Sequence, residues 1–154
     1  MSEQNEQVYA MLCDILEDQS FLLPDEDGEG STACPDSGLM VSMAATGTDK
    51  DWRLHMAFAQ VVCDEIASNL LGADPDADDF EEICRDAVGE MVNVLAGRLI
   101  YEVCAQDGRY QFTSPEVTAL TPEAWQQVVS ADGAIVVSVE GAPVALSFGS
   151  AALA

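Results

Sequence analysis

Two alternating segments, separated by only a short link, constrain the fold of this 154-residue chain more than any other feature. In residues 52–59, large apolar side chains occupy every second position: Trp52, Leu54, Met56 and Phe58. This period of two is typical of a strand with one buried face. Residues 38–47 precede it, joined through TDKD, and so short a link predicts a hairpin rather than a crossover. His55 falls on the more polar face, where we interpret it as an ordinary strand residue.

Three helices are predicted around this hairpin. Apolar residues recur at helical spacing in residues 3–20, and a second helix over residues 60–72 is closed by its terminal glycine. An acidic turn then leads into a long third helix. Asp78 is its expected N-cap, with Glu81 as the capping-box partner, and the helix is expected to end near Gln106.

The rest of the chain predicts loops and further strands. Residues 24–38 have the composition of a surface loop. Short extended pieces are expected around 109–121, followed by paired strands at 134–139 and 143–150. The strands are too closely spaced for repeated parallel crossovers. We therefore predict an α+β fold, with a largely antiparallel β-sheet packed against α-helices in a single domain over residues 1–154.

The charge balance excludes several classes of partner. Acidic residues outnumber basic ones by 28 to 5, the net charge is −23, and no Lys or Arg precedes Lys50. Nucleic acids and anionic membranes are bound through basic patches, so we expect neither as a partner. A solubilising or salt-adapted surface also accounts for such a charge. The apolar runs are shorter than a membrane span and the N-terminus is not a secretory leader, so we expect a cytoplasmic protein.

The cysteine and histidine content limits the chemistry that the chain can perform by itself. The five cysteines are widely spaced without a CxxC pair, and four lie among apolar residues of the predicted helices. We interpret them as buried, reduced thiols, consistent with a reducing compartment. His55 is the only histidine, so a His-rich zinc site and most Ser-His or Cys-His catalysis are hard to build.

Two acidic loops partly match the EF-hand calcium-binding pattern, and neither matches it fully. The loop beginning at Asp25 has Gly30 at the glycine position, but its twelfth position is Asp36 rather than Glu and a strand follows. In the second loop, Asp79 replaces the glycine and Arg85 occupies the twelfth position. We interpret both as solvated loop charge and helix N-terminal charge, which the helix dipole favours.

The third predicted helix has two contrasting faces. At about 100° per residue, one face gathers the expected core residues: Cys84, Val88, Met91, Val92, Leu95, Leu99 and Val103. The opposite face holds Asp86, Glu90, Asn93, Gly97 and Tyr101. Glu90 and Asn93 are three residues apart, so their side chains project side by side, and Gly97 lacks a side chain one turn later. Because Asn and Gly are poor helix formers, we expect this face to serve something other than helix stability.

The segment DAVGEMVNVLAGRL resembles the active helix of the CheC/CheX/FliY family of chemotaxis phosphatases, whose signature is G-E-[aliphatic or small]-x-N-[aliphatic]-x-A-G-[basic or small]. Upstream, VVCDEIASNLLGADPDADDFEEICRDAVGE is similar to the family's helix, glycine turn, acidic linker and second helix. Downstream, RYQFTSPEVTAL is similar to its strand with a T-x-P-x-V step. The resemblance covers residues 61–121. Only one E-x-x-N motif is intact, as in the CheX branch, because Ser68 stands three residues after Glu65.

This resemblance implies a phosphatase that hydrolyses the aspartyl phosphate of a CheY-like response-regulator receiver domain. Glu90 and Asn93 are then the catalytic residues: Glu90 pairs with the receiver's active-site lysine, and Asn93 orients the attacking water. Asp86, Glu90 and Gly97 are expected to contact the partner, with Tyr101 bordering the site. The resemblance implies no metal or cofactor of the chain's own, since the Mg²⁺ belongs to the receiver, and the CheX branch implies a homodimer.

Two other functions stay open. The same fold also suits a non-catalytic binding module that docks a signalling partner through this helix, because a fold does not determine a function. A purely structural or ion-buffering acidic protein is the third possibility.

Overall fold

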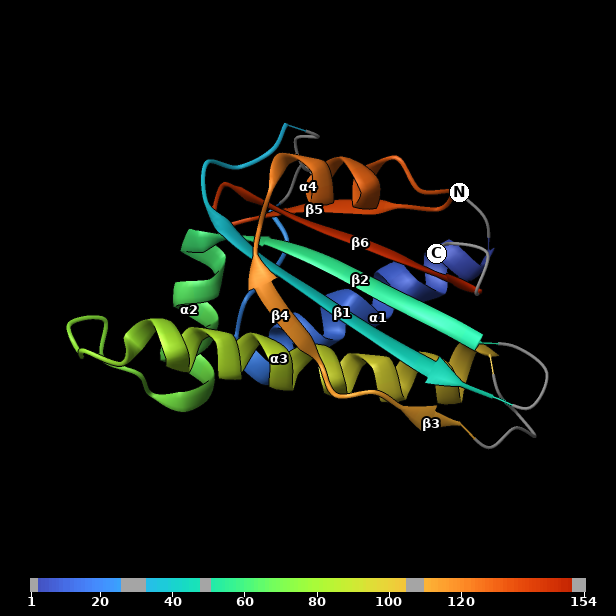
Figure 1. Ribbon diagram of the computed structural model, residues 1–154, viewed down its shortest axis with the longest axis horizontal. Helices are drawn as coiled ribbons and strands as arrows, with labels where there is room; N and C mark the ends of the chain where they lie inside the picture. Colours follow the sequence, from blue (N-terminus) through green and yellow to red (C-terminus); the bar gives the residue numbers. More distant parts are fainter. Residues whose placement is uncertain (1–2, 26–32, 48–50, 105–109, 151–154) are drawn as a thin grey trace.

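The computed structural model describes residues 3–25, 33–47, 51–104 and 110–150 (Figure 1). Within these residues the chain forms four α-helices, a π-helical segment and a six-stranded sheet. The helices are α1 (Glu3–Ser20), α2 (Gln60–Leu71), α3 (Phe80–Leu99) and α4 (Pro122–Val129), and η1 (Ile100–Cys104) continues α3. The strands are β1 (Gly38–Thr46), β2 (Asp51–Ala59), β3 (Gln111–Phe112), β4 (Glu116–Ala119), β5 (Ile135–Val139) and β6 (Ala142–Ser150).

The predicted hairpin forms the centre of the sheet. β1 and β2 pair antiparallel over their full length, with Gly38 opposite Ala59 and Thr46 opposite Asp51. The strand order is β3-β1-β2-β6-β5, and all described pairs are antiparallel. β3 and β4 both pair with β1, so they follow one another along the same edge of the sheet.

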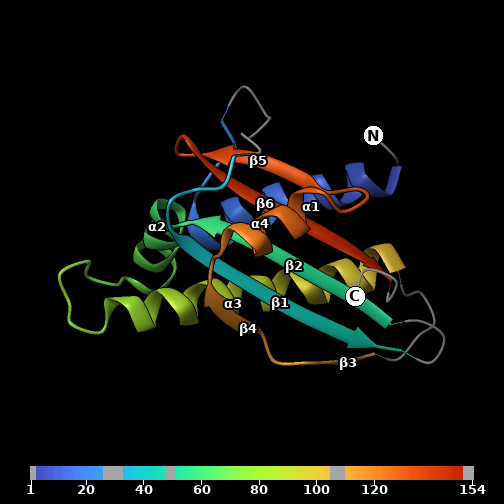
Figure 2. The same ribbon diagram turned by 45° about the horizontal axis from the view of Figure 1, so that its top comes forward.

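The sheet is covered differently on its two faces (Figures 1 and 2). On one face, α1, α2 and α3 enclose the main core together with inward side chains of the strands, among them Val41, Met56, Phe58 and Leu146. On the other face, Trp125 and Val128 of α4 pack against Met40, Ala57 and Ala145. This alternation along the strands follows from the period of two. The predicted α+β fold, with a largely antiparallel sheet packed against helices, is confirmed.

Two predictions about the third helix need correction. Its N-cap is Asp79 rather than Asp78, and this residue makes no side-chain capping hydrogen bond, so the expected capping box with Glu81 does not form. The α-helix ends at Leu99 and continues as the wider η1 to Cys104, whereas a single helix to Gln106 was expected; Gln106 itself lies outside the described residues. The closure of α2 at Gly72 is confirmed, because this residue adopts a left-handed conformation with φ 64°.

The helix α4 was missed, because no element was predicted between the extended pieces around 109–121 and the strand at 134–139. The signals for a helix start were present in the sequence. The side chain of Thr121 accepts a hydrogen bond from the backbone nitrogen of Ala124 at 3.1 Å, and Pro122 occupies the first turn, the position where its missing N–H costs nothing.

The interpretation of the cysteines as buried thiols is right for two of the four whose side chains are described. Cys63 and Cys84 are buried, and burial raises the pKa of each thiol to about 12. Cys13 and Cys34 are only half-buried, so for them the expectation was wrong, and the side chain of Cys104 lies outside the described part. His55 is an ordinary strand residue, as expected, with its Nδ1 2.9 Å from the Ser42 hydroxyl. Burial and the nearby Arg53 charge lower its pKa.

The first acidic loop contains an interaction that its composition does not reveal. Residues 26–32 lie outside the described part of the chain. Most of the positions compared with the EF-hand pattern fall within them. Asp25 is not merely solvated, because its Oδ2 accepts hydrogen bonds from the Ser138 hydroxyl at 2.6 Å and from the Gly141 backbone N–H at 3.0 Å. The carboxylate therefore links the N-terminal segment to the β5–β6 hairpin through two hydrogen bonds. None of the helices among the described residues is long and apolar enough to cross a bilayer.

The hydrogen bond from Ser138, followed by that from Gly141, lowers the pKa of Asp25 below its usual 3.8. A lowered folded-state pKa means that the ionised form stabilises the fold above pH 3.8, and that this contribution is lost as the pH falls through the folded-state pKa. We expect Asp25→Asn to lower the thermal unfolding midpoint at neutral pH, because an amide oxygen is the weaker acceptor. The deficit relative to wild type should shrink in strong acid. Asp132→Asn, at an exposed position before β5, is the control, and a deficit that stays constant into acid contradicts the assignment.

Candidate functional site

The orientation of α3 is set by what it buries. All the predicted core residues of α3 itself are buried: Cys84, Val88, Met91, Val92, Leu95 and Leu99. The stripe is wider than predicted and also includes Ala87, Gly89 and Ala96. The side chain of Val103 lies outside the described part. Because this face packs into the main core, the opposite face of α3 has to point outward.

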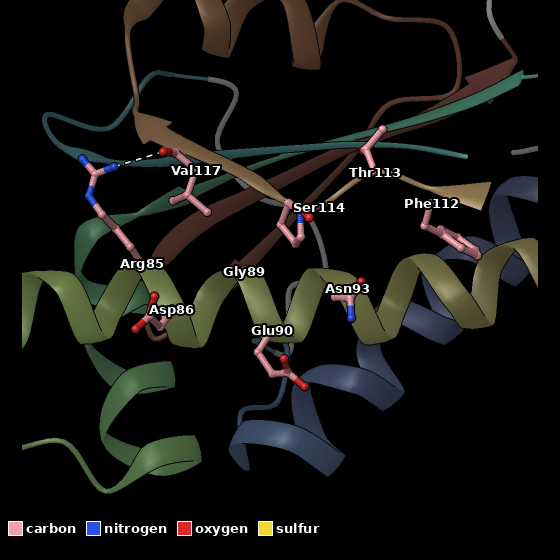
Figure 3. A pocket seen from close by; sticks show the side chains of 10 residues that line it. Arg85, Asp86, Gly89, Glu90, Asn93, Phe112, Thr113, Ser114 and Val117 are labelled. Carbon is pink, nitrogen blue, oxygen red and sulfur yellow. Dashed lines mark hydrogen bonds between the residues drawn. The ribbon is translucent and has the colours of Figure 1, made fainter. Parts of the chain in front are cut away.

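That outward face carries the residues predicted for the site. Asp86, Glu90 and Asn93 are exposed, and Gly97 is half-exposed. Figure 3 shows Glu90 and Asn93 leaving neighbouring turns of α3 on the same side of the helix. Among the described residues, neither side chain is hydrogen-bonded or ion-paired. The carboxylate and the amide are therefore both available to groups from outside the chain.

The site has a second wall, which the sequence did not identify as part of it. An open groove of about 590 Å³ runs between α3 and the β3–β4 edge of the sheet (Figure 3). On the helix side it is lined by Arg85, Asp86, Gly89, Glu90 and Asn93. On the sheet side it is lined by Phe112, Thr113, Ser114, Pro115 and Val117. The available signal was the T-x-P-x-V step, whose position opposite α3 only the fold reveals.

The second wall is held in place at both ends. At the β3 end, the Thr113 backbone N–H donates to the Ala44 carbonyl, and the Ala44 N–H donates to the Thr113 hydroxyl, both at 2.9 Å. At the β4 end, Nη1 of Arg85 donates to the Val117 carbonyl at 3.0 Å, linking the wall directly to α3. The groove is therefore formed in the free protein.

The two glycines of the motif have different environments. A Cβ at Gly89 would lie 3.4 Å from a methyl group of Val117 and 3.7 Å from Cβ of Pro115, so this glycine lies where the two walls meet. A Cβ at Gly97 would have nothing within 4 Å. Packing within the described chain therefore gives no reason for the glycine at Gly97, which is consistent with close approach by another molecule.

The groove offers binding and orienting groups rather than a covalent catalyst. Its polar groups are two carboxylates, one amide, two hydroxyls and the Arg85 guanidinium. No His or Cys lines it, and no group of three His, Cys, Asp or Glu side chains among the described residues is placed to hold a metal ion. A carboxylate here can pair with a cation, and an amide can hold a water through one donor and one acceptor.

Comparison with known families confirms the resemblance on which the site was predicted. Residues 40–139, which include α3 and both walls of the groove, match the sequence profile of the family described as Chemotaxis phosphatase CheX. No curated protein matches the chain.

Solved structures share the fold over nearly the whole chain. The chemotaxis protein CheX from Desulfovibrio desulfuricans has a TM-score of 0.69 at 16 % identity, over 97 % of this chain and 99 % of that one. CheX from Vibrio vulnificus has a TM-score of 0.69 at 18 % identity, over 96 % and 97 %. A complex of CheX with CheY, BeF3 and Mg²⁺ from Borrelia burgdorferi has a TM-score of 0.62 at 15 % identity, over 96 % of each chain. At these identities the likeness concerns the fold.

The open space around Gly97 predicts an effect on stability. We expect Gly97→Ala to raise the free energy of unfolding by about 1 kcal/mol, because alanine is the better helix former and the added methyl group meets no atom. Gly89→Ala is the matched variant and should gain less, since its methyl group must fit against Val117. Urea unfolding followed by circular dichroism measures both. A Gly97→Ala protein less stable than wild type would show that the position is constrained within the chain.

Proposed function

We propose, starting from the membership of this chain in the CheX family of chemotaxis phosphatases, that it accelerates hydrolysis of the aspartyl phosphate on a CheY-like receiver domain. One observation carries the proposal: Glu90 and Asn93 stand exposed on one face of α3, beside a preformed groove, with no partner among the described residues. The similar Borrelia structure, a complex of CheX with CheY, BeF3 and Mg²⁺, supports a receiver domain as the partner.

Glu90 is proposed to anchor the receiver. Its carboxylate is exposed at the rim of the groove and is free to pair with the active-site lysine that the family resemblance implies on the receiver. Charge-assisted hydrogen bonds of this kind are stronger than neutral ones. The same contact would orient α3, so that the next exposed polar side chain on the helix, Asn93, reaches the phosphoryl group.

Asn93 is proposed to position the attacking water. The water oxygen attacks phosphorus in line with the bond to the aspartyl oxygen. That bond breaks, its electron pair goes to the receiver's carboxylate, and the proton released by the water ends on phosphate or solvent. Phosphoryl transfer depends mainly on positioning and charge stabilisation, and orienting the nucleophile lowers the entropic part of the barrier. An amide is therefore sufficient, and no covalent nucleophile is needed.

The Mg²⁺ of the reaction is assigned to the receiver rather than to this chain. The carboxylates of the groove, Asp86 and Glu90, do not belong to any metal-binding group of three among the described residues. On the receiver, the ion would supply charge neutralisation at the phosphoryl oxygens. We place the reaction in the cytoplasm, where receiver domains are phosphorylated.

Phosphate release from a phosphorylated receiver tests the two roles separately. We expect Asn93→Ala to reduce the acceleration by about 100-fold or more, the size of loss seen when a positioning group is removed, with receiver affinity largely kept. Glu90→Ala should also weaken binding by about 10-fold or more, because a hydrogen bond to a charged group contributes about 1.5–3 kcal/mol.

Matched controls separate these effects from changes of charge or helix content. Glu82→Ala removes an exposed carboxylate from the same helix outside the groove, and Gln127→Ala removes an exposed amide on α4. Both variants should accelerate phosphate loss and bind the receiver as the wild-type protein does. A wild-type protein that binds the phosphorylated receiver without speeding phosphate loss would contradict catalysis and support the non-catalytic binding module instead.

The homodimer is a further part of the proposal. It follows from the resemblance to the CheX branch, and the two copies would each present an outward α3 face. Sedimentation equilibrium measures the mass directly. Twice the mass of one chain is the expected result, and the mass of a single chain at all concentrations contradicts it.

A further inference from the structure

Two large aromatic side chains stand exposed at the η1 end of the proposed site. Tyr101 is 78 % exposed and Phe112 is 43 % exposed. Phe112 lines the groove from the β3 side, and Asn93 lines it from α3 (Figure 3). Tyr101 follows Glu90 by eleven residues, which at about 100° per residue brings it back to nearly the same side of the helix, about 16 Å along the axis.

Along the outward face of α3, the position between Asn93 and Tyr101 is a glycine, Gly97. This glycine is half-exposed, and a Cβ at this position would have no atom within 4 Å. Along the outward face, the order is therefore the Glu90 carboxylate, the Asn93 amide, the backbone of Gly97 and the Tyr101 ring. A partner surface that reaches Asn93 can continue over Gly97 without obstruction.

The position of Phe112 is set by contacts within the chain and does not depend on a partner. It borders a small apolar cavity together with Ala96 and Ile100. The floor of the cavity includes the stacked rings of Trp52 and Phe148, with centroids 5.1 Å apart and planes 16° apart. β3 also pairs with β1, which places Phe112 opposite Ala45. Held aromatic side chains lose little conformational entropy on binding and are typical anchors of interfaces.

A receiver contact made by Glu90 and Asn93 alone would be too small. Specific protein interfaces cover about 800 Å² on each partner, and two polar side chains supply a small part of that. A chain with a net charge of −23 also repels an acidic partner at longer range, partly screened by salt. The free energy gained by burying apolar surface does not depend on net charge. Aromatic side chains bury the largest apolar area per residue.

We propose that Tyr101 and Phe112, together with Gly97 one turn before Tyr101, form the affinity-determining half of the receiver-docking surface. This inference rests on the proposed function. The occupant is an apolar or aliphatic patch of the receiver domain next to its phosphorylated aspartate. The pair contacts no reacting atom, so it governs how tightly the receiver is held and leaves the hydrolytic step to Asn93.

Steady-state dephosphorylation of the receiver tests this assignment. We expect Tyr101→Ala and Phe112→Ala each to raise KM by about 5- to 30-fold, the effect of losing a contact of 1–2 kcal/mol, with kcat unchanged. Tyr101→Phe should stay close to wild type, because the apolar ring is kept. The fold-change in KM should be the same at low and high salt, whereas the effect of Glu90→Ala should diminish at high salt.

Controls keep the result interpretable. Phe21→Ala removes an aromatic side chain of matched exposure, 76 %, at the end of α1 outside the groove, and it should leave KM unchanged. Phe112→Leu replaces Phe112→Ala if the latter does not fold, as judged by circular dichroism. An unchanged KM in the Tyr101 and Phe112 variants, or a lower kcat at constant KM, overturns the inference.

This test distinguishes the inference from the proposed function. Failure of the wild-type protein to accelerate phosphate loss contradicts the proposed function alone. In that case the same variants are compared by the dissociation constant for the receiver bound to BeF3 and Mg²⁺. A weaker complex in both variants supports the docking surface, and equal affinity overturns it.

Discussion

The packing of α3 against the sheet is the interaction on which the rest of the site depends. Val88, Met91 and Leu95 are fully buried in the main core, so the helix cannot turn about its axis without exposing them. A turn of about 100° would also bring a polar side chain of the outward face toward the interior, where an unpaired carboxylate is strongly disfavoured. The apolar stripe therefore fixes the direction of Glu90 and Asn93 as firmly as it fixes the core. The positions proposed for function lie outside this packed stripe, so their side chains are not fixed by the core.

The groove depends on β1 in addition. α3 packs beneath this strand, and β3 and β4 both pair with its free edge. Both walls are thus attached to one central strand, and the hydrogen bond from Arg85 to the Val117 carbonyl joins them directly. Such a preformed site suits a reaction in which orientation is the main contribution. The proposed phosphatase activity is also compatible with so few basic residues, because the cationic groups that the chemistry needs are assigned to the receiver. The chain supplies a carboxylate, an amide and a shaped surface.

The parts of the structure that could be predicted from the sequence are those with a strong local period. The central hairpin follows from the alternation in β2, and the outward face of α3 follows from the helical spacing of its core residues. The second wall could not be predicted in this way, because β3 and β4 are too short to show a period and their place opposite α3 is a tertiary contact. The bracing of the β5–β6 hairpin by Asp25 is also a contact between distant segments, and the composition around Asp25 indicated only a solvated loop. The helix α4 is different, since Thr121 and Pro122 are local signals for a helix start that the sequence analysis did not use.

In the proposed reaction, the amide of Asn93 completes a hydrolytic centre that a receiver domain supplies. The isosteric change Asn93→Asp tests it most directly, because it keeps the size of the side chain while replacing the donor with a negative charge next to the phosphoryl group. The measurement is the rate of phosphate loss from a phosphorylated receiver in the presence of a saturating amount of the variant. We expect the receiver then to decay at its own unassisted rate. Acceleration equal to that of the wild-type protein would contradict it.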